Sequence, residues 1–148
     1  MAEAGILFTM EEKRADLRGP GKYLVAWLPA GAWAALIFAL SAQPGLTFAP
    51  DAGIDLVIRK AGHVAFFAIL ALLTWRAVAR TTTSRRPWTW ALGMTVAYAV
   101  TDELHQAFVA QREASVHDVA LDAVGAVIAV LALEIVGTTR RRRAQSPE

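Results

Sequence analysis

The chain contains no cysteine. Disulfide frameworks, zinc–thiolate centres and thiol nucleophiles are therefore excluded. Charged residues are also scarce, at 19% of the 148 residues, whereas 55% are hydrophobic. A soluble domain of this size has too little interior to bury so much apolar surface, because small domains have a high ratio of surface to volume. The composition therefore indicates a membrane protein whose apolar side chains are covered by lipid.

Four apolar runs predict four membrane-spanning helices, at about Tyr23–Ala42, Ala61–Ala79, Pro87–Phe108 and Ser115–Gly137. The first has 20 residues without a charge, which covers a hydrocarbon core at a rise of roughly 1.5 Å per residue. It is too long for the core of a signal peptide, and further apolar runs follow it. No alternating strand pattern competes. We predict an all-α fold, a compact bundle of about four transmembrane helices.

The chain divides into a polar N-terminal segment (1–22), a membrane domain (23–137) and a basic tail (138–148). We expect both polar ends to be poorly ordered. The connection Gln43–Arg59 contains prolines and glycines and is expected to be irregular, with part of it dipping into the membrane interface. Ser115 is the predicted N-cap of the last helix, and Asp118, three residues later, gives a loose capping box.

The basic residues predict the orientation. Twelve of the 15 fall in three clusters on one side of a four-span arrangement: Lys13, Arg14, Arg18 and Lys22; Arg76, Arg80, Arg85 and Arg86; and Arg140 to Arg143. By the positive-inside rule this side faces the cytoplasm, so both termini are cytoplasmic. The last cluster is expected to meet anionic lipid headgroups of the bilayer, and no nucleic-acid partner is predicted.

Ionisable residues gather at the opposite, outer ends of the spans. Lys60 and His63 are three apart on one face of the second. In the third span, the side chains of His105, Asp102, Gln106 and Glu103 occupy an arc of roughly 160° around the helix. Leu104 lies opposite them and is expected to face lipid. Glu103 and His105 lie at the two edges of that arc, so they are not expected to bind the same atom.

The fourth span carries Asp118 and Asp122 four residues apart, and the small residues Gly125 and Ala129 continue this stripe, which would let another helix approach closely. Arg112 stands in the short turn before it, within reach of the acids. We therefore predict that Lys60 and Arg112 form ion pairs with the carboxylates of the third and fourth spans, which are Asp102, Glu103, Asp118 and Asp122.

A charge within the hydrocarbon costs roughly 2.5–3.5 kcal/mol, so intramembrane charges usually turn inward and serve a function. The predicted ligand-binding site comprises Lys60, His63, Asp102, Glu103, His105, Gln106, Arg112, Asp118 and Asp122. Taken singly, some have ordinary explanations. Lys60 suits an interfacial anchor, His63 a packing histidine, and Asp118 an acid at a helix N-terminus.

These residues resemble the VanZ-like family of bacterial integral membrane proteins. The resembling pieces span about residues 24–133: Leu40-Ser41-Ala42-Gln43-Pro44-Gly45, Lys60 with His63, Asp102-Glu103-Leu104-His105-Gln106, then Arg112, Asp118 and Gly125. The chain departs from the family pattern at Arg59, at Phe66 and Phe67, at Ala110-Gln111 and at Asp122.

The resemblance implies a multi-pass protein of the bacterial cytoplasmic (inner) membrane with a role in the cell envelope. The family is named for a protein associated with low-level resistance to the glycopeptide teicoplanin, which extends the expectation to glycopeptide susceptibility. The first functional hypothesis is therefore a polar site near the outer face that binds a lipid headgroup, a cell-wall precursor or a glycopeptide-like ligand. The sequence does not indicate an oligomeric state.

Two alternatives stay open. In a membrane-embedded enzyme, Glu103 or Asp118 would act as base and His63 or His105 as acid, because burial and neighbouring charges bring such groups toward a neutral pKa. A carboxylate–histidine set also suits a divalent metal, although the sequence assigns no cofactor. In a structural membrane subunit, the same charges would fix the packing of the helices. No serine nucleophile elbow, HExxH motif or phosphate loop favours a named reaction.

Overall fold

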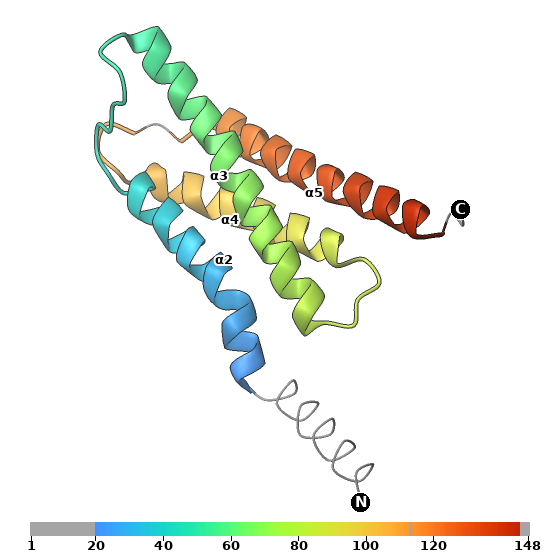
Figure 1. Cartoon of the computed structure of the whole chain (residues 1–148). Helices are drawn as coiled ribbons and strands as arrows, with labels where there is room; N and C mark the ends of the chain where they lie inside the picture. The colour runs from blue at the N-terminus through green and yellow to red at the C-terminus, as the bar shows by residue number, and fades with distance from the viewer. Residues whose placement is uncertain (1–19, 113, 146–148) are drawn as a thin grey trace, which may run out of the picture.

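The computed structural model describes residues 20–112 and 114–145, which form four helices and no strand (Figure 1). They are α2 (Pro20–Ser41), α3 (Ala52–Thr81), α4 (Pro87–Gln106) and α5 (Val116–Gln145). The predicted all-α bundle is confirmed. Most of the predicted N-terminal segment, with Lys13, Arg14 and Arg18, lies outside the described residues.

Three of the helices are long and apolar enough to cross a membrane: Gly21–Ser41, Ala52–Thr81 and Val116–Gly137. Many of their large apolar side chains face outward; Leu24 is 73% exposed and Ile135 is 65% exposed. Apolar surface on this scale requires lipid rather than water around it. The remaining helix, α4, has 20 residues and carries two acids near its C-terminal end. That it crosses the membrane stays a prediction.

The start of α3 differs from the prediction. We expected an irregular connection as far as Arg59 and a span from Ala61, but the helix already begins at Ala52. Asp51 has extended backbone geometry and accepts a hydrogen bond from the N–H of Ile54 at 2.9 Å, so it caps the helix and fixes its first turn. Only residues 42–51 are non-helical between α2 and α3.

The other boundaries follow ordinary helix chemistry. Pro87 stands in the first turn of α4, where its missing N–H costs nothing. The Ser115 hydroxyl accepts from the N–H of His117 at 3.2 Å, which confirms it as the N-cap of α5. At its other end α5 continues through the basic residues to Gln145, beyond the predicted span end at Gly137.

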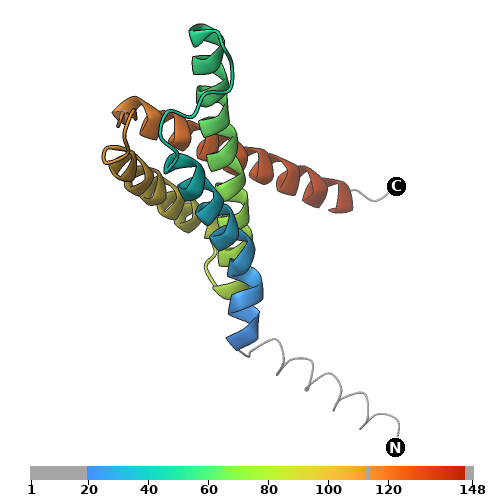
Figure 2. The same cartoon turned by 90° about the vertical axis from the view of Figure 1, so that its left-hand side faces the viewer.

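The central helix is α3, which packs against α2, α4 and α5. Many of the buried residues are alanines, including Ala71, Ala99 and Ala126. The backbones of α3 and α5 approach closely at Gly125 of α5, where a Cβ atom would overlap the backbone carbonyl of Val64 in α3. Small residues at helix contacts are how membrane helices gain packing contacts, because lipid removes the hydrophobic driving force between them. At this contact α5 crosses α3 rather than running alongside it (Figure 2).

Three polar side chains tie α2 to its neighbours. Trp33 donates its indole N–H to the carbonyl of Phe66 at 2.9 Å, and Trp27 donates to the Thr81 hydroxyl at 3.3 Å. Tyr98 of α4 donates its hydroxyl to the carbonyl of Ala34 at 2.7 Å. These bonds hold α2 in register along the bundle, although its contact with α4 is small.

The α2–α3 and α4–α5 connections lie together at one end of the bundle, which we call the polar end, and the α3–α4 connection (82–86) lies at the other (Figure 1). The two polar-end connections touch. Gly45 has a φ of 59°, and a Cβ atom there would overlap the side-chain amide of Gln111, whose own φ is 63°. At position 45, only glycine adopts this positive φ without strain and without displacing the side chain of Gln111.

Candidate functional site

The polar residues of three helices meet at the polar end of the bundle. Lys60 and His63 come from the first half of α3, the polar run Asp102–Gln106 ends α4, and Asp118 and Asp122 lie in the first two turns of α5. The sets from α4 and α5 lie next to the connection between these two helices, whereas Lys60 and His63 lie further along α3. Their convergence follows from antiparallel packing of successive helices.

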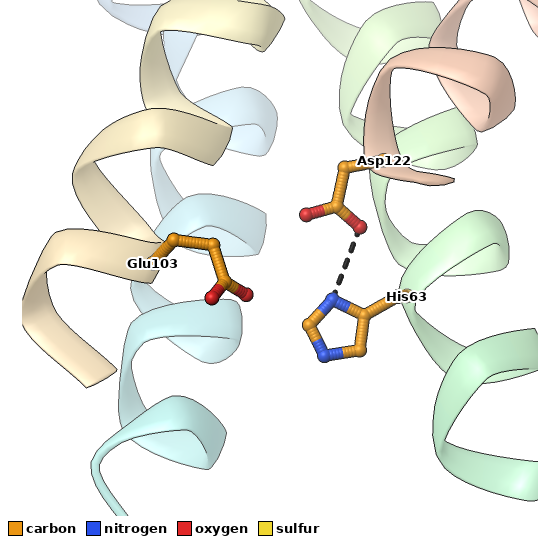
Figure 3. Close-up of side chains that lie close together, drawn as sticks. All are labelled: His63, Glu103 and Asp122. Atoms are coloured by element: carbon orange, nitrogen blue, oxygen red, sulfur yellow. Dashed lines mark hydrogen bonds and ion pairs between the residues drawn. The ribbon is translucent and has the colours of Figure 1, made fainter. Parts of the chain in front are cut away.

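One group at the polar end consists of His63, Glu103 and Asp122, one residue from each of α3, α4 and α5 (Figure 3). His63 Nδ1 lies 3.0 Å from Asp122 Oδ1. Asp122 is fully buried and Glu103 is 4% exposed, whereas the His63 side chain is 18% exposed. All three side chains point toward one another in Figure 3, and their potential ligand atoms lie within 4.8 Å of each other.

Glu103 also fixes the start of α5. Its Oε2 accepts the backbone N–H of Ser115 at 2.8 Å. In the predicted capping box, the carboxylate of Asp118 would accept this N–H of Ser115. Glu103 accepts it instead, so the predicted capping box is wrong. Asp118 instead forms an ion pair with Lys60 across the gap between α5 and α3. The predicted pairing of Lys60 with an acid is therefore present.

A separate network surrounds Asp102. Its Oδ2 accepts from the Ser41 hydroxyl at 2.8 Å and from the Gln106 side-chain amide at 3.0 Å, and all three residues are buried. Gln106 lies one turn after Asp102 on the same face, and its amide also lies 3.3 Å from the Ser41 hydroxyl. This network joins α4 to the end of α2. Asp102 and Glu103, adjacent in sequence, thus serve different helices.

The predicted ion pairs of Arg112 are not formed, so that expectation is wrong. Its guanidinium donates from Nη2 to the carbonyl of Leu40 at 3.1 Å and from Nε to the carbonyl of Gln43 at 3.2 Å. The last carbonyls of a helix have no partner within the helix and attract cations, so the C-terminal end of α2 competes successfully for this side chain. No acid among the described residues pairs with Arg112.

His105 lies outside the cluster. Its ring stacks on Phe38 of α2 at a centroid separation of 4.3 Å, and its Nε2 has no hydrogen-bond partner among the described residues. The prediction that Glu103 and His105 do not share a bound atom agrees with this placement. Leu104, between them, is 60% exposed, as expected of a side chain that faces lipid.

Two adjoining pockets open beside these residues. The larger has a volume of about 570 Å³ and is mostly polar, with the lining residues Leu56, Arg59, Lys60, His63, Gln106, Gln111, Arg112, Ser115 and Asp118. The smaller, of about 80 Å³, is mostly apolar and lies between the end of α2, the α2–α3 connection and α3. Arg59, His63 and Arg112 line both pockets. We call them the polar pocket and the apolar pocket.

A family model described as VanZ/LLP1 matches residues 12–137. The chain belongs to the VanZ/LLP1 family. The resemblance drawn from the sequence motifs is thereby confirmed, and the matched region contains every residue of the polar end. No curated protein and no solved structure matched the chain.

Sequence reasoning missed two residues of this VanZ/LLP1 domain. The first is Asp55 in the first turn of α3, which is 4% exposed. Its Oδ1 accepts the N–H groups of Phe48 at 2.6 Å and Ala49 at 3.3 Å. Its Oδ2 lies 2.9 Å from Nε of Arg59. It thereby fastens the α2–α3 connection, which forms a wall of the apolar pocket. Ser41 belonged to a recognised motif, but no sequence signal showed that it would bond to Asp102.

Proposed function

We propose that this VanZ/LLP1-family protein binds an anionic amphiphile of the cell envelope, with the charged head group in the polar pocket and an apolar part in the apolar pocket. The observation that carries the proposal is Arg112. It lines both pockets and has no acid partner among the described residues, so guanidinium N–H groups remain for a ligand.

The charge of the polar pocket supports an anion. Its lining includes the cations Arg59, Lys60 and Arg112 against the single carboxylate of Asp118 among the described residues. Lys60 pairs with Asp118 and Arg59 pairs with Asp55, so each of these charges is largely balanced. Among the described residues the charge of Arg112 is left in excess, and a planar guanidinium suits phosphate or carboxylate oxygens.

The setting supports an envelope ligand. We propose that all four helices cross the bacterial cytoplasmic membrane with both termini in the cytoplasm. The connection 82–86 is so short that α4 must start where α3 ends, and α4 then packs back along α3 toward the polar end. The basic cluster Arg76, Arg80, Arg85 and Arg86 around the 82–86 connection favours the cytoplasm for that end by the positive-inside rule. The polar end then opens at the outer leaflet, where lipid headgroups and cell-wall precursors are found.

Native mass spectrometry of the detergent-solubilised protein tests this proposal. The probes are phosphatidylglycerol and a polyprenyl phosphate, with zwitterionic phosphatidylcholine as the comparison. We expect Arg112→Gln to weaken binding of the anionic probes roughly tenfold, the loss of about one charge-assisted hydrogen bond. Arg112→Lys should retain most of the affinity if charge is the main attraction. Equal affinity of the wild type for phosphatidylcholine would contradict the proposal.

Arg85→Gln, in the connection at the opposite end of the bundle, is the matched control and should leave binding unchanged. Because Arg112 also holds the carbonyls of Leu40 and Gln43, the melting temperature of each variant must be measured beside its affinity.

The same variants address glycopeptide susceptibility. A deletion strain should change its teicoplanin sensitivity, and wild-type protein should restore it while Arg112→Gln does not.

A further inference from the structure

The group formed by His63, Glu103 and Asp122 holds two carboxylates, and no lysine or arginine among the described residues pairs with them. Lys60 is paired with Asp118, and Arg112 is bound to the end of α2. A protonated His63 would balance only one of the two acids. Burial of an uncompensated carboxylate is costly, so this group calls for a cation or a proton at its centre.

Individual atoms indicate where a cation would bind. Asp122 Oδ2 and Glu103 Oε1 are buried and have no hydrogen-bond partner among the described residues. Both side chains are more than nine-tenths buried, and Figure 3 shows them pointing at the same place, with the imidazole of His63 closing the third side. Native proteins rarely leave such atoms without a partner, so an unpaired oxygen on each of two converging acids indicates a missing ligand.

We propose that His63, Glu103 and Asp122 bind a divalent transition-metal ion, of which Zn²⁺ and Mn²⁺ fit best. One imidazole and two carboxylates suit these ions, whereas Ca²⁺ and Mg²⁺ favour oxygen ligands alone. Ligands of a tetrahedral ion with bonds of about 2.0–2.2 Å stand roughly 3.3–3.6 Å apart. The observed separations, from 3.0 Å between His63 and Asp122 up to 4.8 Å within the group, require only small side-chain rotations to reach this spacing.

The surroundings hold the ligands in place. Glu103 is anchored through Oε2 to the Ser115 N–H, which leaves Oε1 for the metal. The His63 ring lies parallel to that of Phe67, with an interplanar angle of 5°. Gly125, one turn after Asp122, lets α5 approach α3 at Val64, the residue next to His63. Outer contacts of this kind orient metal ligands and raise affinity.

Three protein ligands leave a coordination position open. His63 lines the polar pocket, so that position is reached from the pocket in which we propose the anionic head group binds. The metal site does not depend on that proposed function. A metal alone can be tested without an amphiphile, and the Arg112→Gln variant used for the amphiphile leaves every metal ligand in place.

Isothermal titration of the metal-free protein in detergent, with Zn²⁺, Mn²⁺ and Mg²⁺ in separate runs, tests the proposal. The protein should carry an affinity tag without histidine. We expect one equivalent of Zn²⁺ or Mn²⁺ to bind, with Mg²⁺ much weaker. Glu103→Gln and Asp122→Asn, which keep the side-chain shape, should each weaken binding by about tenfold or more. His117→Asn, which removes an exposed histidine outside the group, should leave affinity unchanged.

Thermal unfolding supplies the second measurement. A metal that binds only the folded protein should raise the melting temperature of the wild type and of His117→Asn. At the same metal concentration it should raise that of Glu103→Gln or Asp122→Asn by less, when each is folded without metal. Absence of stoichiometric Zn²⁺ and Mn²⁺ binding by the wild type would overturn the proposal. So would unchanged affinity in both carboxylate variants, which would mean that the metal binds elsewhere.

Discussion

Adjacent acids in one short run of sequence have separate structural roles. Asp102 faces α2 and accepts hydrogen bonds from Ser41 and Gln106, whereas Glu103 faces α3 and α5 and holds the N–H of Ser115. The 100° turn between successive residues of a helix separates them. The hypothesis of a structural charge network therefore fits Asp102, and the hypothesis of a ligand site fits Glu103. Acid–base catalysis at Glu103, Asp118 or His63 stays a prediction.

A double-mutant cycle on Ser41 and Asp102 measures the structural role. We expect Ser41→Ala and Asp102→Asn each to lower the free energy of unfolding. The coupling energy should be about 0.6 kcal/mol, the average for hydrogen bonds between membrane helices, and no more than about 1.7 kcal/mol. Unfolding by sodium dodecyl sulfate provides the measurement. Strictly additive effects would show that the 2.8 Å contact contributes nothing to stability.

Much of the site could be predicted at the scale of residues, because helical spacing alone places Asp102 with Gln106 and opposes them to Leu104. The partners of Arg112 could not be predicted from the sequence. Whether a cation binds an acid or a helix C-terminus depends on which lies nearer in space, and the sequence does not give the position of the α2 end relative to the turn before α5. The same reason hid the bond between Ser41 and Asp102.

At the scale of helices, the contact between α3 and α5 positions the proposed metal-binding group. Gly125 allows the two backbones to meet, and His63 and Asp122 lie beside that contact. Apolar runs and capping residues predicted all four helices. The early start of α3 was missed because it depends on Asp51, which accepts the N–H of Ile54 in the first turn of α3, and on Asp55, which accepts N–H groups of the connection. Neither contact follows from a periodic pattern.

Replacement of Gly125 by alanine tests this contact. The new methyl group would overlap the Val64 carbonyl, a backbone atom that cannot rotate away, so α5 must move. We expect a loss of stability of about 1–3 kcal/mol, typical of an overpacked contact, and weaker metal binding. Gly93→Ala in α4 is the matched control: nothing lies within 4 Å of its Cβ, and it should stabilise the helix slightly. Equal stability of the two variants would contradict a close contact.

For the whole molecule, orientation decides which compartment the polar end meets. The absence of native cysteine allows single cysteines to report on it. Thr47 and Thr83 are exposed residues of the α2–α3 and α3–α4 connections, at opposite ends of the bundle. In bacterial spheroplasts, a membrane-impermeant maleimide should label Thr47→Cys at once and Thr83→Cys only after permeabilisation. The reverse pattern would place the polar pocket in the cytoplasm.

The contact between Gly45 and Gln111 makes the two connections at the polar end a single unit. A fusion partner or an antibody epitope inserted into either one would disturb both, and with them Arg112 and the walls of the two pockets. The connection 82–86 touches none of these residues. It is therefore the place to insert a rigid fiducial for electron cryomicroscopy, since this small protein could then be imaged with its binding residues intact.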